Sequence, residues 1–212
     1  MMSDKMIDRL VDDLTPVKPL KARDGLALTL MTAAVFAALV AVFGGIRGDI
    51  LMGIPDPMFF LRGGALLLLG LTSSYAVIAM SQPAVGNSFK GWVWALFAAL
   101  LFPATAAVMA MIAAPDNMSI FVPRYGVECL AISMLVGTGI AAAQVFWLRR
   151  GAPVALDRAG WLVGMSSGAL GAAAYSLHCP FNSIFYIGLW YSLAVAICAI
   201  LGRLIVPRLI RW

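Results

Sequence analysis

Long apolar runs separated by short polar segments dominate this chain. Their hydrophobic side chains are continuous and rich in alanine, leucine, valine and methionine, without the alternation that a half-buried strand shows. Each run has about 20 residues, the length at which an α-helix crosses the hydrocarbon core of a bilayer. The pattern therefore predicts six transmembrane helices, at residues 26–44, 59–80, 91–113, 127–148, 159–177 and 183–206.

The composition is that of a membrane protein. Of the 212 residues, 62% are apolar and only 12% are charged, which is about half the charged share of a typical soluble domain. In hydrocarbon each backbone group must be paired inside its own helix or in a closed barrel, and the absence of alternation favours helices. We expect an all-α membrane protein with two parts, a cytoplasmic segment at residues 1–24 and a six-transmembrane-helix bundle at residues 25–212.

The basic residues predict the orientation of the chain in the membrane. If the N-terminus lies in the cytoplasm, 12 of the 15 lysines and arginines fall inside, and three, Arg47, Arg62 and Arg124, fall outside. This bias is typical of a multi-pass membrane protein, and an even number of spans returns the C-terminus to the cytoplasm. The net charge of +5 therefore reflects topology and does not indicate a direct nucleic-acid partner. We expect Arg62 to extend to lipid headgroups, and the first run to be retained as an anchor, not cleaved as a signal peptide.

A short amphipathic helix is predicted within residues 1–24. Ile7, Leu10, Val11 and Leu14 follow at i, i+3, i+4 and i+7, which places them on one helical face. Aspartates cover much of the opposite face, whereas a helix that lies on lipid normally has a basic polar face. The stripe fits the docking of a protein partner. Three alternatives stay open: packing on the chain's own loops, a lipid-surface helix, or an unstructured leader.

Small residues recur along the predicted fifth span. Gly160, Gly164 and Gly168 have four-residue spacing, which lets helix backbones approach closely. We interpret them as a packing spine inside the bundle in preference to a dimerisation motif. No span has an ionisable side chain near its centre. Because ion and proton pathways usually need such groups, a transporter or channel is disfavoured.

The candidate chemistry lies in two cysteines and the only histidine. Cys129 lies at the outer start of the fourth span, and His178 and Cys179 lie in the outer loop before the sixth. Cys198, within an apolar span, has the character of a small hydrophobic residue. The sequence has no Ser/His/Asp candidate set, no phosphate-binding glycine loop and no Cys-x-x-Cys pair. We therefore expect no enzyme activity and no permanent cofactor.

Three interpretations of Cys129 and Cys179 stay open. They would form a permanent structural disulfide, which is common outside the cytoplasm, or act as a redox sensor that an oxidant or electrophile modifies. In the third interpretation, the two thiolates and His178 transiently hold a soft metal ion such as zinc, cadmium or copper(I). Adjacent His178 and Cys179 are not a standard spacing for zinc ligands.

The six spans and three local features together resemble the negative regulators of sigma F, a family of six-helix anti-sigma factors of the bacterial inner membrane. The local features are the segment Asp13-Leu14-Thr15-Pro16-Val17, Cys129, and the loop His178-Cys179-Pro180. The resemblance implies that the chain holds an extracytoplasmic-function sigma factor inactive at the membrane. It also implies that Cys129 and Cys179 sense heavy-metal or oxidative stress outside and trigger release. The partner-binding residues would then be Ile7, Leu10, Val11, Leu14, Pro16 and Val17.

A second function class uses the same thiols. A membrane thiol oxidoreductase would pass electrons between outer thiols and quinone, but such enzymes generally use the Cys-x-x-Cys pair that this sequence lacks. The anti-sigma interpretation is therefore the expected function, with a sigma factor and the lipid bilayer as the expected partners.

Overall fold

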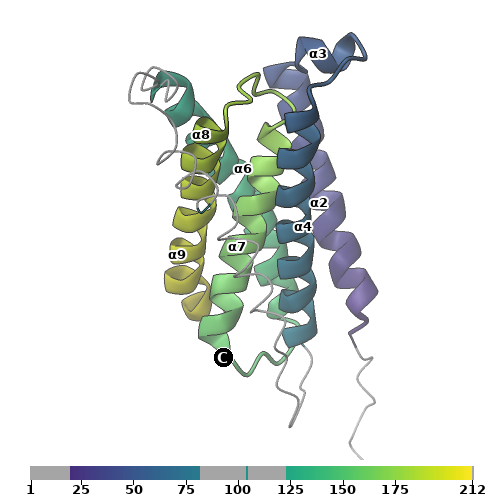
Figure 1. The fold of residues 1–212 in the computed structure, drawn as a ribbon. Helices are drawn as coiled ribbons and strands as arrows, with labels where there is room; N and C mark the ends of the chain where they lie inside the picture. Colours follow the sequence, from purple (N-terminus) through teal and green to yellow (C-terminus); the bar gives the residue numbers. More distant parts are fainter. Residues whose placement is uncertain (1–19, 82–103, 105–122, 212) are drawn as a thin grey trace, which may run out of the picture.

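The computed structural model describes residues 20–81, 104 and 123–211. These residues form helices and loops, without a β-strand in the described ranges (Figure 1). The first part of the chain contributes α2 (Ala22–Gly44), the short α3 (Gly48–Leu51) and α4 (Pro57–Met80). The second part contributes α6 (Pro123–Leu148), α7 (Leu156–Tyr175), and a last helix built from α8 (Ile184–Tyr186), the π-helical turn η2 (Ile187–Tyr191) and α9 (Ser192–Leu209).

The prediction of helices is confirmed for the five apolar runs that the structure describes, with bounds shifted by a few residues. Four of these helices are long and apolar enough to cross a membrane, namely Ala22–Gly44, Pro57–Met80, Arg124–Leu148 and Ile184–Leu209. The described residues thus support four candidate spans in place of the six expected. The expected third span, residues 91–113, lies outside the described residues, as does the predicted amphipathic helix within residues 1–24.

The helix α7 accounts for one of the two missing spans, because it lies at the expected fifth span and is less apolar than the others. It contacts α2, α4, α6 and α9, and in Figure 1 it runs through the middle of the bundle. Every residue from 162 to 175 is buried. Its glycines, alanines and serines give it a lower hydropathy than a lipid-facing helix needs, since its surroundings are protein.

Glycines bring α7 and α9 into backbone contact. A Cβ atom added at Gly160 would lie 2.8 Å from the carbonyl oxygen of Gly202, and one at Gly164 would lie 2.6 Å from the Cα atom of Ala199. At Gly168 the added atom would lie 3.0 Å from the Cα atom of Val195. A row of side chains on this face of α7 would therefore force the two helices apart.

A buried polar network joins three helices in the same region. Gln144 of α6 donates a hydrogen bond from Nε2 to Ser74 Oγ of α4, at 3.1 Å. Ser166 of α7 donates from Oγ to Gln144 Oε1, at 2.7 Å. All three side chains are buried, and in an apolar interior such bonds define how neighbouring helices are aligned.

We expect Gly164→Ala to destabilise the folded protein by about 1–3 kcal/mol, because the new methyl group meets backbone atoms of α9 that cannot rotate away. The measurement is unfolding by SDS in mixed micelles, followed by circular dichroism. The matched control is Gly64→Ala in α4, where an added Cβ meets no atom within 4 Å. The control should leave stability unchanged or raise it by up to about 1 kcal/mol. Equal effects of the two substitutions would contradict the close α7–α9 contact.

Candidate functional site

Two free thiols are buried at one end of the helix bundle. Cys129 lies in the second turn of α6, and Cys179 lies in the loop that joins α7 to α8. Their exposed fractions are 0% and 1%. The two residues are 50 positions apart in sequence, and the contact between α6 and α7 brings them into one cluster of buried side chains.

Hydroxyl groups surround the two thiols. The side chains of Ser133, Tyr186 and Tyr191 lie within interaction range of Cys129, and the two tyrosines also interact with Cys179. The Tyr186 hydroxyl donates a hydrogen bond to the carbonyl oxygen of Tyr125 at 3.0 Å. The hydroxyls of Ser133 and Tyr191 are buried and form no hydrogen bond of good geometry within the part of the chain that the structure describes. We call this buried group of two thiols and three hydroxyl-bearing side chains the thiol chamber.

A buried arginine of α4 holds the loop that carries Cys179. The guanidinium group of Arg62 donates hydrogen bonds to the carbonyl oxygens of Phe181 at 2.7 Å, Ser176 at 3.2 Å and Cys179 at 3.4 Å. Its exposed fraction is 0%. The Tyr191 ring lies 5.2 Å from the guanidinium carbon, within the range of a cation–π contact.

This placement shows that the prediction for Arg62 was wrong. The sequence suggested that Arg62 would extend to lipid headgroups, because it precedes an apolar run near the expected membrane surface. The loop between α7 and α8 instead covers this end of α4 and offers several backbone carbonyls, so the guanidinium group turns inward. No pattern within the sequence around Arg62 indicates that a segment more than a hundred residues away would supply its partners.

A second arginine, from the segment between α2 and α3, binds the same loop. Arg47, between α2 and α3, donates to the carbonyl oxygen of Cys179 at 2.9 Å and to Asn182 Oδ1 at 2.8 Å. Its other nitrogens donate to both carboxylate oxygens of Asp49, at 2.9 and 2.7 Å. These hydrogen bonds from Arg47 lower the pKa of the Asp49 carboxyl from 3.8 to about 2. Asp49 therefore stays ionised near neutral pH and fixes the direction of the Arg47 side chain.

The predicted three-ligand metal site is not assembled. His178 turns toward the end of α2, where its Nδ1 lies 3.1 Å from the carbonyl oxygen of Gly45, and its ring packs against Tyr175. Among the described residues no three His, Cys, Asp or Glu side chains form a group that would hold a metal ion. The reason is local geometry, because in the turn after α7 the His178 ring faces Gly45 and Tyr175 while Cys179 is buried in the core. Of the three predicted ligands, only Cys129 and Cys179 lie in the thiol chamber.

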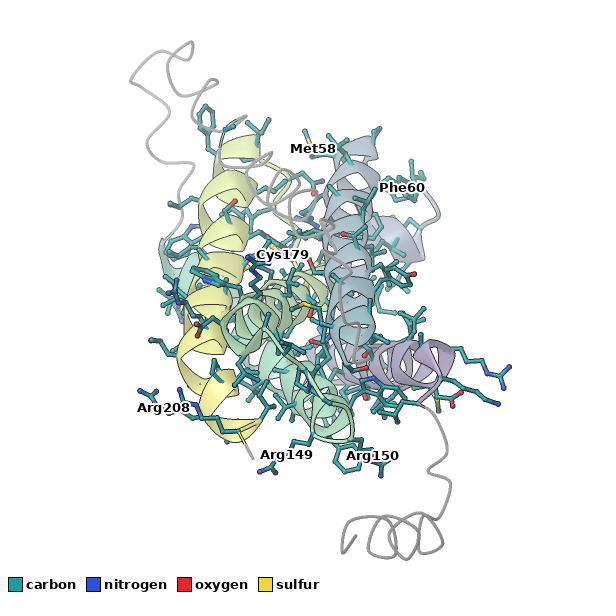
Figure 2. All side chains as sticks on the ribbon, turned by 90° about the horizontal axis from the view of Figure 1, so that it is seen from below. Met58, Phe60, Arg149, Arg150, Cys179 and Arg208 are labelled. Carbon is teal, nitrogen blue, oxygen red and sulfur yellow. The ribbon has the colours of Figure 1, made fainter. Side chains whose placement is uncertain are left out.

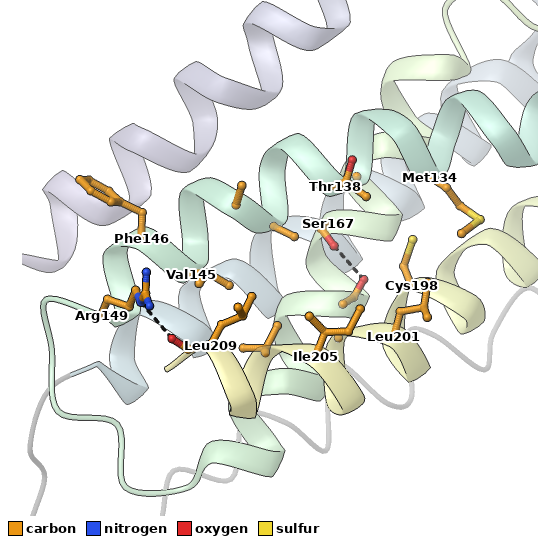
Figure 3. Close-up of a pocket in the computed structure, with 16 residues that line it drawn as sticks. Met134, Thr138, Val145, Phe146, Arg149, Ser167, Cys198, Leu201, Ile205 and Leu209 are labelled. Carbon is orange, nitrogen blue, oxygen red and sulfur yellow. Dashed lines mark hydrogen bonds between the residues drawn. The ribbon is translucent and has the colours of Figure 1, made fainter. Parts of the chain in front are cut away.

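The third cysteine lies elsewhere in the bundle. Cys198 of α9 packs against Gly168 of α7 and lines an apolar groove of about 370 Å³ between α6 and α9 (Figure 3). The groove has mainly aliphatic walls, with Ser167 at its floor and Arg149 at one end. Arg149 donates from Nε to the carbonyl oxygen of Leu209 at 2.9 Å, which joins the ends of α6 and α9. The residues that line this groove include Cys198 but not Cys129 or Cys179.

The thiol chamber and the start of α2 lie at opposite ends of the bundle. In Figure 1 α3 and α8 lie at one end, while the start of α2 and the end of α9 lie at the other. Figure 2 shows Arg149, Arg150 and Arg208 along one margin, away from Met58 and Phe60. The predicted partner-binding residues, Ile7, Leu10, Val11, Leu14, Pro16 and Val17, lie outside the described residues.

Comparison with known proteins gives a match over nearly the whole chain. The family model described as "Negative regulator of sigma F" (NrsF) matches residues 10–212. The chain is 31% identical to the anti-sigma-F factor NrsF of Caulobacter vibrioides and 28% identical to a probable anti-sigma-F factor NrsF of Azospira oryzae. Each alignment covers the full length of both chains. No solved structure matches.

We expect mild oxidation of the membrane-embedded protein with diamide to join Cys129 to Cys179 and to leave Cys198 reduced. The reason is that the first two thiols share the same tyrosine neighbours, while Cys198 packs against glycines of α7. Peptide mapping without reduction would identify the bond. Cys198→Ser should behave like wild type, and Cys129→Ser should form no internal disulfide. A disulfide that includes Cys198 would contradict the arrangement.

Proposed function

The chain belongs to the NrsF family of negative regulators of sigma F, and from this premise we propose that it is a membrane anti-sigma factor with an outer thiol sensor. In this proposal its N-terminal segment sequesters an extracytoplasmic-function sigma factor. Modification of Cys129 or Cys179 by a heavy metal or an oxidant then releases that factor. The observation that carries the proposal is the family match over residues 10–212 together with two buried thiols at the end of the bundle opposite the start of α2.

The proposal places the protein in the bacterial inner membrane. The four apolar helices supply the hydrocarbon-facing surface, with residues 91–113 and the central α7 completing six spans. The bias of the basic residues supports an orientation with both termini in the cytoplasm. With this orientation Arg47, Arg62 and the thiol chamber lie on the outer side, where metal ions and oxidants arrive.

Binding of the sigma factor is assigned to the amphipathic stripe at residues 7–14 together with Pro16 and Val17. Burial of four apolar side chains contributes about 1.5–3 kcal/mol each, or roughly 6–12 kcal/mol. Ordering of about nine residues costs about 1–2 kcal/mol per residue. The two contributions are similar, so the stripe alone binds weakly, and the neighbouring residues or cytoplasmic loops must add contacts.

Release requires that the outer event change the affinity on the inner side. A shift of the partner from 99% bound to 1% bound needs about 5.5 kcal/mol of differential affinity. Formation of a disulfide or of a metal–thiolate bond is of this order. The route inward runs through α4, because Ser81 at the C-terminal end of α4 is hydrogen-bonded to α6 and to the loop that follows α6. There Ala152 donates from its backbone N–H to the carbonyl oxygen of Ser81 at 3.0 Å, and Trp147 donates from Nε1 to Ser81 Oγ at 3.2 Å.

We expect Leu10→Asp or Leu14→Asp to abolish capture of the sigma factor, because each places a charge in the apolar docking face. The measurement is a pulldown from bacterial membranes with mass spectrometry of the bound proteins. Asp12→Asn, on the opposite face of the predicted helix, is the matched control and should retain wild-type capture. Wild-type capture by both aspartate variants would show that the docking helix is assigned to the wrong residues.

We expect cadmium or an oxidant to remove the sigma factor from the wild-type protein, and not from the Cys129→Ser/Cys179→Ser double variant. The reason is that only these two thiols lie in the outer chamber. The same pulldown, with and without treatment, measures the loss, and Cys198→Ser serves as the control that keeps the response. Release that does not need the two cysteines would leave an anti-sigma factor whose signal acts elsewhere.

A further inference from the structure

Both thiols of the proposed sensor are closed off from solvent, so a reagent reaches them only when the residues around them move. We propose that Arg62 is the positioning residue that keeps the loop at residues 176–182 closed and thereby sets how readily Cys179 reacts. The biological meaning of this role rests on the proposed sensing function. The opening itself is a property of the folded chain, and it is measured without a sigma factor.

The contacts of Arg62 span Cys179 on both sides. Its three hydrogen bonds end on the carbonyl oxygens of Ser176, Cys179 and Phe181. The guanidinium group is planar and its donors have a fixed geometry. These carbonyls therefore have to stay in one arrangement for all three bonds to persist. In that arrangement the Cys179 side chain is 1% exposed.

The charge of Arg62 makes this closure conditional. Within the described residues no carboxylate forms an ion pair with Arg62, and its Nε atom is buried without a hydrogen-bond partner. The cation is held by neutral carbonyls and by the face of the Tyr191 ring. A buried charge that loses such partners must be rehydrated. A shift of the loop therefore draws water toward Arg62, and with it the dissolved reagent.

Arg47 forms the second arm of the same clamp. It donates to the Cys179 carbonyl oxygen at 2.9 Å, so two arginines from different elements meet on the backbone of the reactive residue. Arg47 is buried and tied to Asp49 of the short helix α3, whereas Arg62 is fixed to the long helix α4. Chemistry that displaces Cys179 thus acts directly on α4 through Arg62.

The experiment measures thiol labelling rates in the full-length protein reconstituted in lipid vesicles. The probe is sulfonatoethyl methanethiosulfonate, an anionic reagent that stays in water, and peptide mass spectrometry assigns the label to each cysteine. The variants are Arg62→Gln, Arg62→Lys and Arg47→Gln. Arg149→Gln is the matched control, because Arg149 also donates to a backbone carbonyl but lies at the other end of the bundle. Cys198 reports general loosening of the helices in every sample.

We expect Arg62→Gln to label Cys179 at least about tenfold faster than wild type, since a hydrogen bond to a charged group is worth that factor or more. In Arg62→Lys, which retains a charged donor, the Cys179 labelling rate should lie between the rates of wild type and Arg62→Gln. Cys198 labelling should stay at the wild-type rate, and Arg149→Gln should behave like wild type.

If Cys179 in the Arg62→Gln variant is labelled at the same rate as in the wild-type protein, the proposal is overturned. A parallel rise at Cys198 in both Arg62 variants would overturn it as well, because Arg62 would then be a general packing residue. If Arg62→Gln does not fold, Arg62→Lys and Arg47→Gln decide the matter, and unchanged Cys179 rates in both reject the clamp. Faster Cys179 labelling without any sigma-factor response would retain the clamp and reject the sensing function.

Discussion

A buried charged group must be satisfied by the groups around it, and this constraint shapes the end of the bundle that carries α3 and α8. Arg62 is fully buried, and its guanidinium group draws three carbonyl oxygens of one loop toward α4. The position of that loop places Cys179 beside Cys129 and the hydroxyls of Tyr186 and Tyr191. The thiol chamber is therefore a consequence of how one cation is accommodated.

Small residues make the remainder of this arrangement rigid. Gly160, Gly164 and Gly168 allow α7 to touch the backbone of α9, while Gln144 and Ser166 tie α7 to its other neighbours. Interiors packed this closely pass displacements along whole helices, because their side chains have little free volume. A bundle of this kind is suited to connect an event at one end with a binding surface at the other.

The sequence alone supplied the helices and the family resemblance. Continuous apolar runs fix helix positions in hydrocarbon, because no other single segment satisfies its own backbone, and the five described runs form helices close to the expected bounds. The spacing of Gly160, Gly164 and Gly168 also suggested a close helix contact before α9 was known to be the partner. The same reasoning counted residues 159–177 among the membrane spans, whereas α7 is not among the helices apolar enough to cross a membrane and is buried among the other helices.

Tertiary structure alone decided what surrounds the candidate chemistry. The sequence singled out Cys129, His178 and Cys179 as one set, yet the turn after α7 directs His178 toward Gly45 and leaves the two thiols together. The sequence pattern also predicted Arg62 at the lipid surface, whereas the loop that contains Phe181 encloses the Arg62 side chain. Local patterns record which residues are apolar and how they repeat. Which distant carbonyl receives an arginine depends on how the helices pack, and that is a property of the assembled bundle.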